Sequence, residues 1–165
     1  MSYVLSQRLK KVLPKLINED QTGNLQIRFI GVNHRQIQDM IDSYKIEGAI
    51  IFVDFIKPFN TLELDFMFNT LKHFSFNDSF ICWIQILYSD VQTCVSNNGW
   101  VSEIFKNSRG IRQACPLSAL LFILSVEIMA LRLRSNKNIK GITITIDNKI
   151  ILCKFRNTQM MHIFF

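Results

Sequence analysis

The sequence lacks closely spaced cysteines and a secretory signal. Its four cysteines (Cys82, Cys94, Cys115 and Cys153) form neither a CxxC pair nor any similar spacing, which argues against a zinc site. Charged residues interrupt the apolar periodicity of residues 2–17, so this segment does not resemble a signal peptide. We therefore expect free thiols in a reducing compartment and an intracellular protein, with nucleus and cytoplasm both open.

Long hydrophobic runs are also missing. The longest, residues 119–131, has about 13 residues and contains Glu127, which is too short for a bilayer span of roughly 20 residues. We expect no membrane partner. No internal repeat, low-complexity linker or domain boundary is visible, and 48% of the 165 residues are apolar, including 14 phenylalanines. These features predict a single folded domain with an aromatic core.

The charge that is present is mostly positive. The formal net charge is +6, and the isoelectric point is about 9.3. The positive residues form two clusters, Arg8, Lys10, Lys11 and Lys15, and then Arg132, Arg134, Lys137 and Lys140. This balance suits nucleic acid or another anionic surface, but solvated helix faces explain it equally well.

Hydrophobic periodicity predicts helices interleaved with a few strands, which indicates an α+β domain. The expected helices cover residues 2–17 (ended or kinked by Pro14), 33–47, 61–74 (capped by Thr61), 78–88 and 116–136. The expected strands cover residues 49–55, a hairpin around the Asn-Asn-Gly turn at 97–99, and two short strands on either side of residues 147–148.

Two segments are candidates for chemistry. The stretch IIFVDFIKPFN at 50–60 places Asp54 at the end of a strand that is otherwise apolar, where the carboxylate either binds a divalent cation or caps the next helix. The stretch SRGIRQACPLS at 108–118 presents two arginines and a glutamine just before a helix. Such a segment suits phosphates and nucleobases, although a solvated loop is the simpler explanation.

Taken together, the segments point to one family. The runs FVDFIKPFNTLELDFMFNTLKHF and NNGWVSEIFKNSRGIRQACPLSALLFILSVEIMALRLRSNKNIKGITI resemble the reverse transcriptase domain of non-LTR, long-interspersed-type retrotransposons. LSQRLKKVLPKLINEDQTG and IGVNHRQIQDMID are similar to the finger region of the same family. The resemblance covers nearly the whole chain, in the order and at the spacings of the family.

The resemblance implies a partial right-hand polymerase with an antiparallel palm sheet backed by helices. Residues 1–47 would form part of the fingers, and residues 48–165 would be mostly palm. Such enzymes copy an RNA template into DNA from a DNA primer, using deoxynucleotide triphosphates and two Mg²⁺ ions. The expected partners are therefore nucleic acid and nucleotides.

Individual positions match the functional residues of the family. Asp54 matches the first palm carboxylate, with the Phe55 carbonyl as an additional metal ligand. Phe59 matches the bulky side chain that excludes a ribose 2′-hydroxyl, with a core aromatic as the alternative. Gln113, with Arg112 and Arg109, matches the loop that packs against the nucleotide and the template. Arg28 matches a finger-loop arginine that contacts the template, with a surface charge as the alternative.

The departures from the family are equally specific. Pro58 and Asn60 replace the usual alanine and aspartate after the first carboxylate, and Ala114 and Ala119 replace a glycine and a proline in the nucleotide loop. The family's aromatic-Ala-Asp-Asp hairpin is replaced by Phe155, Arg156, Asn157 and Thr158. The second carboxylate pair is therefore missing, and two Mg²⁺ ions are poorly supported without it.

Three hypotheses follow from this pattern. The first is a truncated and degenerate reverse transcriptase domain, without the first finger strands and the thumb, that is inactive by itself. The second is a basic module that binds RNA or DNA without catalysis. The third is a retrotransposon remnant with no selected activity, whose exposed strand edges favour aggregation.

Overall fold

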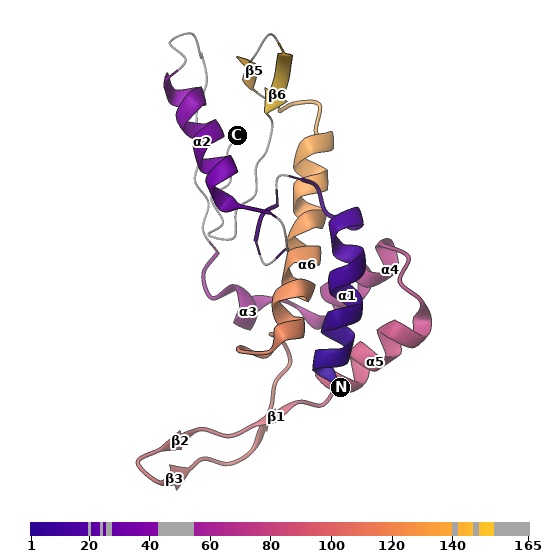
Figure 1. Ribbon diagram of the computed structural model, residues 1–165. Helices are drawn as coiled ribbons and strands as arrows, with labels where there is room; N and C mark the ends of the chain where they lie inside the picture. The colour runs from indigo at the N-terminus through magenta and orange to yellow at the C-terminus, as the bar shows by residue number, and fades with distance from the viewer. Residues whose placement is uncertain are drawn as a thin grey trace. The chain divides into compact units, whose positions relative to one another are not determined.

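The structure is a computed structural model of the chain (Figure 1). It describes residues 1–19, 21–23, 25, 28–42, 55–139, 142–146 and 149–153. The helices are α1 (Ser2–Leu16), α2 (Ile30–Asp42), α3 (Pro58–Thr61), α4 (Leu64–His73), α5 (Asp78–Tyr88) and α6 (Pro116–Ser135). The strands are β1 (Gln92–Thr93), β2 (Ser96–Asn97), β3 (Trp100–Val101), β4 (Phe105–Lys106), β5 (Ile142–Ile146) and β6 (Lys149–Cys153). This mixture of helices and short strands is consistent with part of a reverse transcriptase domain.

The chain divides into two compact units, which are described separately. The first unit contains Met1–Ser6 and Ile56–Ser125, and the second contains Gln7–Phe55 and Val126–Phe165. The boundary between the units falls inside two helices, after Ser6 in α1 and after Ser125 in α6.

Helices form the core of the first unit. In α5, Ile81, Ile84 and Tyr88 are buried at helical spacing, and the Asn77 side chain caps the helix by accepting a hydrogen bond from the Ser79 N–H at 2.8 Å. This confirms the helix expected at 78–88. The first half of α6 adds Leu117, Leu120, Leu121 and Leu124, all nearly inaccessible to solvent.

Helix α6 begins at Pro116, as expected, because a proline at the first helical position loses no intrahelical hydrogen bond. Its 20 residues are long and apolar enough to cross a membrane, by length and composition alone. A buried core helix has the same properties, and 56% of its most apolar window is buried in this fold.

The helix expected at 61–74 is wrong in its first part. Thr61 ends α3, and its hydroxyl donates to the Lys57 carbonyl at 3.2 Å, whereas α4 begins at Leu64 after Glu63. The cause is Pro58, because the fixed φ of proline suits the first position of a helix. A separate helical turn therefore begins at Pro58, before Thr61.

Helix α1 has nearly the bounds expected for the first helix, residues 2–17. Pro14 lies inside it and does not end it, since the helix continues to Leu16. Helix α2 begins at Ile30 rather than near Asn33, and Asn33 is buried within it.

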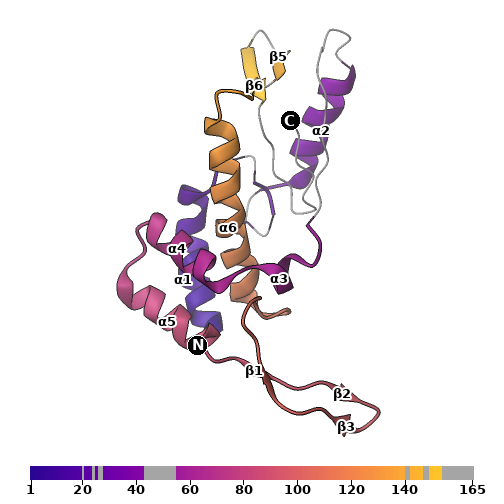
Figure 2. The same ribbon diagram turned by 180° about the vertical axis from the view of Figure 1, so that it is seen from behind.

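Each strand pairs with one antiparallel partner. The expected hairpin is confirmed, because β1 pairs with β4 and β2 pairs with β3 around a turn in which Asn98 and Gly99 both have positive φ (48° and 84°). It extends from the helices of the first unit as a narrow arm in both ribbon views (Figures 1 and 2).

Strands β5 and β6 also pair, as expected. Ile142 lies opposite Cys153 at one end of this pairing, and Ile146 lies opposite Lys149 at the other. Residues 49–54 of the strand expected at 49–55 lie outside the described residues.

A buried hydrogen bond joins α5 to α6, with the Tyr88 hydroxyl 2.8 Å from the Ser118 hydroxyl. We expect Ser118→Ala to lower the free energy of unfolding by about 1–3 kcal/mol, because it removes a partner of a buried hydroxyl. In the double variant with Tyr88→Phe neither hydroxyl remains, so the loss should be smaller than the sum of the two single losses. Urea unfolding measures all three variants, and additive losses would contradict the coupling.

Candidate nucleotide and nucleic-acid interface

The loop at residues 108–113 is attached by its backbone to the segment around α3, about fifty residues earlier in the chain. The Gly110 N–H donates to the Leu62 carbonyl at 2.8 Å, and the Ile111 N–H donates to the Phe59 carbonyl at 2.7 Å. The loop can approach this closely only with glycine at 110. Gly110 has a φ of 93°, and an added Cβ would lie 3.0 Å from the Asn60 carbonyl oxygen.

A side-chain contact reinforces this attachment. The Gln113 amide donates to the Asn60 side-chain oxygen at 3.1 Å. Asn60 stands where the family usually has an aspartate, and an amide oxygen accepts this hydrogen bond as an aspartate would. Phe59 is half-buried, and its ring centroid lies 5.4 Å from that of Phe122 in α6. The structure thus brings Phe59 and Gln113 together in the first unit.

Ala114 occupies a position that suits glycine. Its φ of 57° lies in the left-handed region, where a Cβ is unfavourable. The glycine that the family usually has here would adopt this conformation without strain. Replacing it with alanine therefore strains the backbone directly after Gln113.

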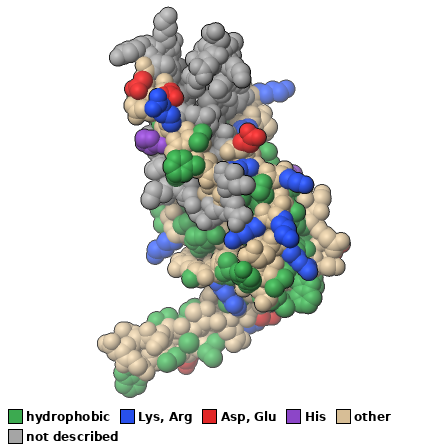
Figure 3. Space-filling model, viewed as in Figure 1, with side chains coloured by type: hydrophobic (Ala, Val, Ile, Leu, Met, Phe, Trp, Pro, Cys, Tyr) green, Lys and Arg blue, Asp and Glu red, His purple; other side chains and the backbone are tan. Residues whose placement is uncertain are grey.

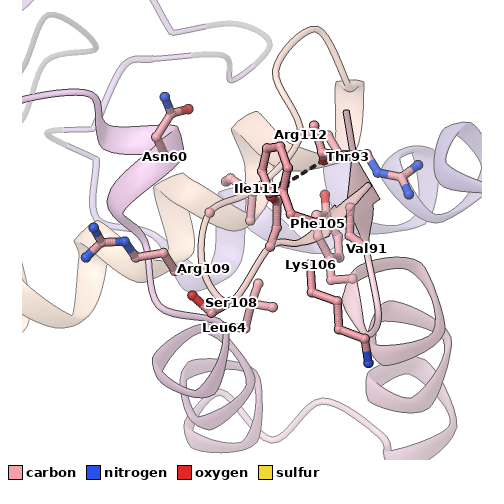
Figure 4. Close-up of a pocket in the computed structure, with 13 residues that line it drawn as sticks. Asn60, Leu64, Val91, Thr93, Phe105, Lys106, Ser108, Arg109, Ile111 and Arg112 are labelled. Carbon is pink, nitrogen blue, oxygen red and sulfur yellow. Dashed lines mark hydrogen bonds between the residues drawn. The ribbon is translucent and has the colours of Figure 1, made fainter. Parts of the chain in front are cut away.

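A cleft of about 440 Å³ lies beside the attached loop (Figure 4). Its walls come from α3, the start of α4, the end of α5, the base of the hairpin and the loop itself. The lining residues are Asn60, Leu64, Tyr88, Val91, Thr93, Phe105, Lys106, Asn107, Ser108, Arg109, Gly110, Ile111 and Arg112. Hydrophobic and aromatic walls with a few cationic and amide groups are typical of sites that bind an anionic ligand with an apolar part.

Three cations line the cleft, and one of them has an acidic partner. Lys106 forms a 2.8 Å ion pair with Asp90, both largely exposed. The hydrogen bond and the charge of Lys106 lower the pKa of Asp90. Arg109 and Arg112 are also exposed. The cleft therefore presents a net positive surface.

Two titratable groups sit where α5 meets the start of α6. Burial raises the pKa of Tyr88 to about 12, against the opposing effect of its hydrogen bond to Ser118. For Cys115, burial acts to raise the pKa, but hydrogen bonds from the backbone N–H groups of Leu117 and Ser118 outweigh it and lower the pKa. The first turn of α6 thus stabilises a thiolate at Cys115.

Arg28 belongs to the second unit and closes the end of α1. Its guanidinium donates to four backbone carbonyls, those of Pro14 (3.2 Å), Ile17 (3.2 Å), Asn18 (2.6 Å) and Gln21 (2.8 Å). A cation is favourable beside the unsatisfied carbonyls of a helix C-terminus. This geometry gives Arg28 a structural role, and its contact with a template stays a prediction.

The expected metal site cannot be located in the described residues. Asp54 and residues 155–158 lie outside them, and Phe55 is described at their edge. Within the part of the chain that the structure describes, no group of three or more His, Cys, Asp or Glu side chains could hold a metal ion.

Comparison with known sequences identifies the family of the chain. Residues 1–163 match the family described as reverse transcriptase (RNA-dependent DNA polymerase). The chain belongs to this family. Its members synthesise DNA on an RNA template, bind template and nucleotides, and generally use divalent metal ions.

Two curated relatives specify the branch of this reverse transcriptase family. The chain is 28% identical over 161 residues to the transposon TX1 uncharacterized 149 kDa protein of Xenopus laevis, covering 95% of the chain and 12% of that protein. It is 32% identical over 75 residues to the retrovirus-related Pol polyprotein from type-2 retrotransposable element R2DM of Drosophila melanogaster, covering 46% of the chain and 7% of that protein. These relatives confirm a reverse transcriptase domain of the non-LTR retrotransposon type. The chain spans only a small fraction of either relative's length.

Most of the cleft wall was not predicted from the sequence. Tyr88, Thr93, Phe105, Lys106 and Asn107 come from the end of α5 and the two ends of the hairpin. The predicted hairpin was the only feature of the sequence that indicated these residues. A hairpin brings its two ends together, next to the segments before and after it, which here are α5 and the loop at 108–113.

Gly110→Ala should break the attachment of the loop to α3. We expect it to lower the free energy of unfolding by about 1–3 kcal/mol, since it adds both an unfavourable φ and a close contact with the Asn60 carbonyl. The matched control is Gly99→Ala, which also has a positive φ (84°) but has no atom within 4 Å of the added Cβ. Urea unfolding compares the two, and an equal loss in both variants would contradict the steric argument.

Proposed function

We propose that this chain is a reverse transcriptase domain that holds nucleotide and nucleic acid but does not carry out nucleotidyl transfer by itself. One observation carries the proposal: the loop at 108–113 is joined to α3 by two backbone hydrogen bonds and by the Gln113–Asn60 contact. This attachment supports the roles proposed for Phe59 and Gln113 at one substrate site.

Each matched residue has a proposed role. Phe59 excludes a ribose 2′-hydroxyl, and its packing on Phe122 gives the ring the firm support that this role needs. Gln113 and Arg112 hold the incoming nucleotide, while Arg109 contacts the template. For Arg28, the bonds to α1 support a role in positioning the chain around residue 28.

The lack of catalysis follows from the carboxylates. Asp54 is the proposed catalytic residue, and it binds metal with the Phe55 carbonyl. Residues 154–165 contain no acidic side chain, and Arg156 lies where the second carboxylate pair is expected. Two Mg²⁺ ions need several anionic oxygens, so Asp54 is left with too few partners. Like the roles above, the intracellular location expected from the cysteines stays a prediction.

Primer extension tests the catalytic part. With an RNA template, a DNA primer, deoxynucleotides and either Mg²⁺ or Mn²⁺, we expect no extension by the chain, and the same result for Asp54→Ala. A known reverse transcriptase in parallel reactions controls for the substrates. Extension by the chain that Asp54→Ala abolishes would overturn the proposed inactivity.

Salt-dependent binding tests the nucleic-acid part. We expect binding of single-stranded RNA or DNA that weakens steeply with added salt, because neutralised phosphates release counterions. Arg109→Ala and Arg112→Ala should each reduce the slope of log K against log salt by roughly 0.7. Lys72→Ala is the matched control, since Lys72 is exposed on α4 of the same unit and does not line the cleft. Fluorescence anisotropy measures the slopes, and no binding at low salt would contradict the proposal.

A further inference from the structure

The hairpin formed by β1 to β4 exposes several large apolar side chains. The exposed fractions of its large hydrophobic side chains are 57% for Val95, 83% for Trp100, 64% for Val101, 69% for Ile104 and 47% for Phe105. Residues 92–105 include one charged side chain, Glu103. In the space-filling view the hairpin carries hydrophobic and uncharged side chains along its length (Figure 3).

The strand register places both aromatic residues on the same face of the hairpin. Trp100 pairs with Asn97, and Phe105 pairs with Thr93. Between them, the Ser102 N–H donates to the Val95 carbonyl at 2.8 Å. Side chains two residues apart share a face of an extended strand, so Thr93, Val95 and Asn97 lie on one side. The register shifts by one residue between the two ladders, which leaves one extra residue between Ser102 and Phe105. Because of this extra residue, Trp100 and Phe105 both fall on the side of their cross-strand partners, although they are five residues apart. We call this side, with Phe105 and Trp100, the aromatic face.

The aromatic face continues directly from the cationic cleft. Thr93 and Phe105 lie on this face and also line the cleft, next to Lys106, Arg109 and Arg112 (Figure 4). A ligand leaving the cleft along the hairpin therefore passes first cations, then Phe105, and then Trp100. The cross-strand partners of these two aromatic residues, Thr93 and Asn97, are four residues apart on the other strand, which corresponds to roughly 13 Å along the hairpin.

This order of groups fits one ligand chemistry. Single-stranded nucleic acid combines phosphates, which the cations neutralise, with bases whose flat faces stack on exposed aromatic side chains. A duplex keeps its base faces inside its own stack, so it would gain little from Trp100. The aromatic face itself is uncharged, so it can contact bases but does not neutralise phosphates.

We propose that the aromatic face of the hairpin extends the nucleic-acid site of the cleft by stacking bases of a single strand on Phe105 and Trp100. This inference rests on the proposed function, because it takes the cleft to bind nucleic acid. It adds a base-binding surface in which Trp100, outside the cleft, is the outermost contact.

The test uses the full chain and a fluorescein-labelled single strand of about 12 pyrimidine nucleotides, within the range of known site sizes. We expect Trp100→Ala to weaken binding by roughly 5- to 100-fold, since stacking of one base has an effect of this size. Trp100→Phe should keep most of the affinity. The salt slope of Trp100→Ala should equal that of the original chain, because no cation is removed.

The chain offers a matched control in its second tryptophan, Trp83, which is 46% exposed on α5. Trp83→Ala should change the affinity less than 2-fold. In the Trp83→Phe variant, Trp100 is the only tryptophan left, and its fluorescence should be quenched by the unlabelled strand. This second readout leaves Trp100 intact, so it does not depend on how Trp100→Ala folds.

The outcomes separate the two proposals. If the original chain binds no single strand at low salt, both the proposed function and the aromatic-face proposal fail. If it binds but Trp100→Ala binds equally well, or if Trp100 fluorescence does not change, only the aromatic-face proposal is overturned. If sedimentation shows that Trp100→Ala instead dissociates an oligomer, the aromatic face is a protein interface and the proposal is wrong.

Discussion

The site depends on two backbone hydrogen bonds, from Gly110 to Leu62 and from Ile111 to Phe59. They join a loop to a helical turn that lies about fifty residues away in the sequence. Together with the Gln113–Asn60 hydrogen bond and the packing of Phe59 on Phe122, they hold one wall of the cleft in place. Only glycine at 110 permits the approach, since any Cβ would contact the Asn60 carbonyl. A single residue without a side chain thus decides whether two sequence motifs form one site.

An added Cβ has different consequences at two positions of this loop. At Gly110 it would contact the backbone of Asn60, whereas Ala114 carries a Cβ at a φ of 57°, where the family usually has glycine. Strain at 114 costs about 1–3 kcal/mol, which a folded core can offset. Asn60 keeps the hydrogen-bonding capacity of the usual aspartate towards Gln113 but lacks its charge. The contact with Gln113 therefore does not depend on the negative charge of the usual aspartate.

Much of the fold could be predicted because it depends on local sequence. The helix at 78–88, the helix that begins at Pro116 and the hairpin around Asn98–Gly99 all follow from periodicity, capping and turn chemistry. Predictions failed where one local signal overrode another. Pro58 started a helical turn before Thr61 could cap one, and α2 began at Ile30 rather than near Asn33.

The sequence by itself determined the family and the candidate residues Phe59, Arg112 and Gln113, because motif order and spacing survive in the printed letters. Tertiary structure decided which groups meet. It placed Arg28 on the carbonyls at the end of α1, joined Gln113 to Asn60, and placed Phe105 in the wall of the cationic cleft. These contacts depend on strand register and on the packing of segments far apart in the chain. No local pattern in the sequence encodes such distances.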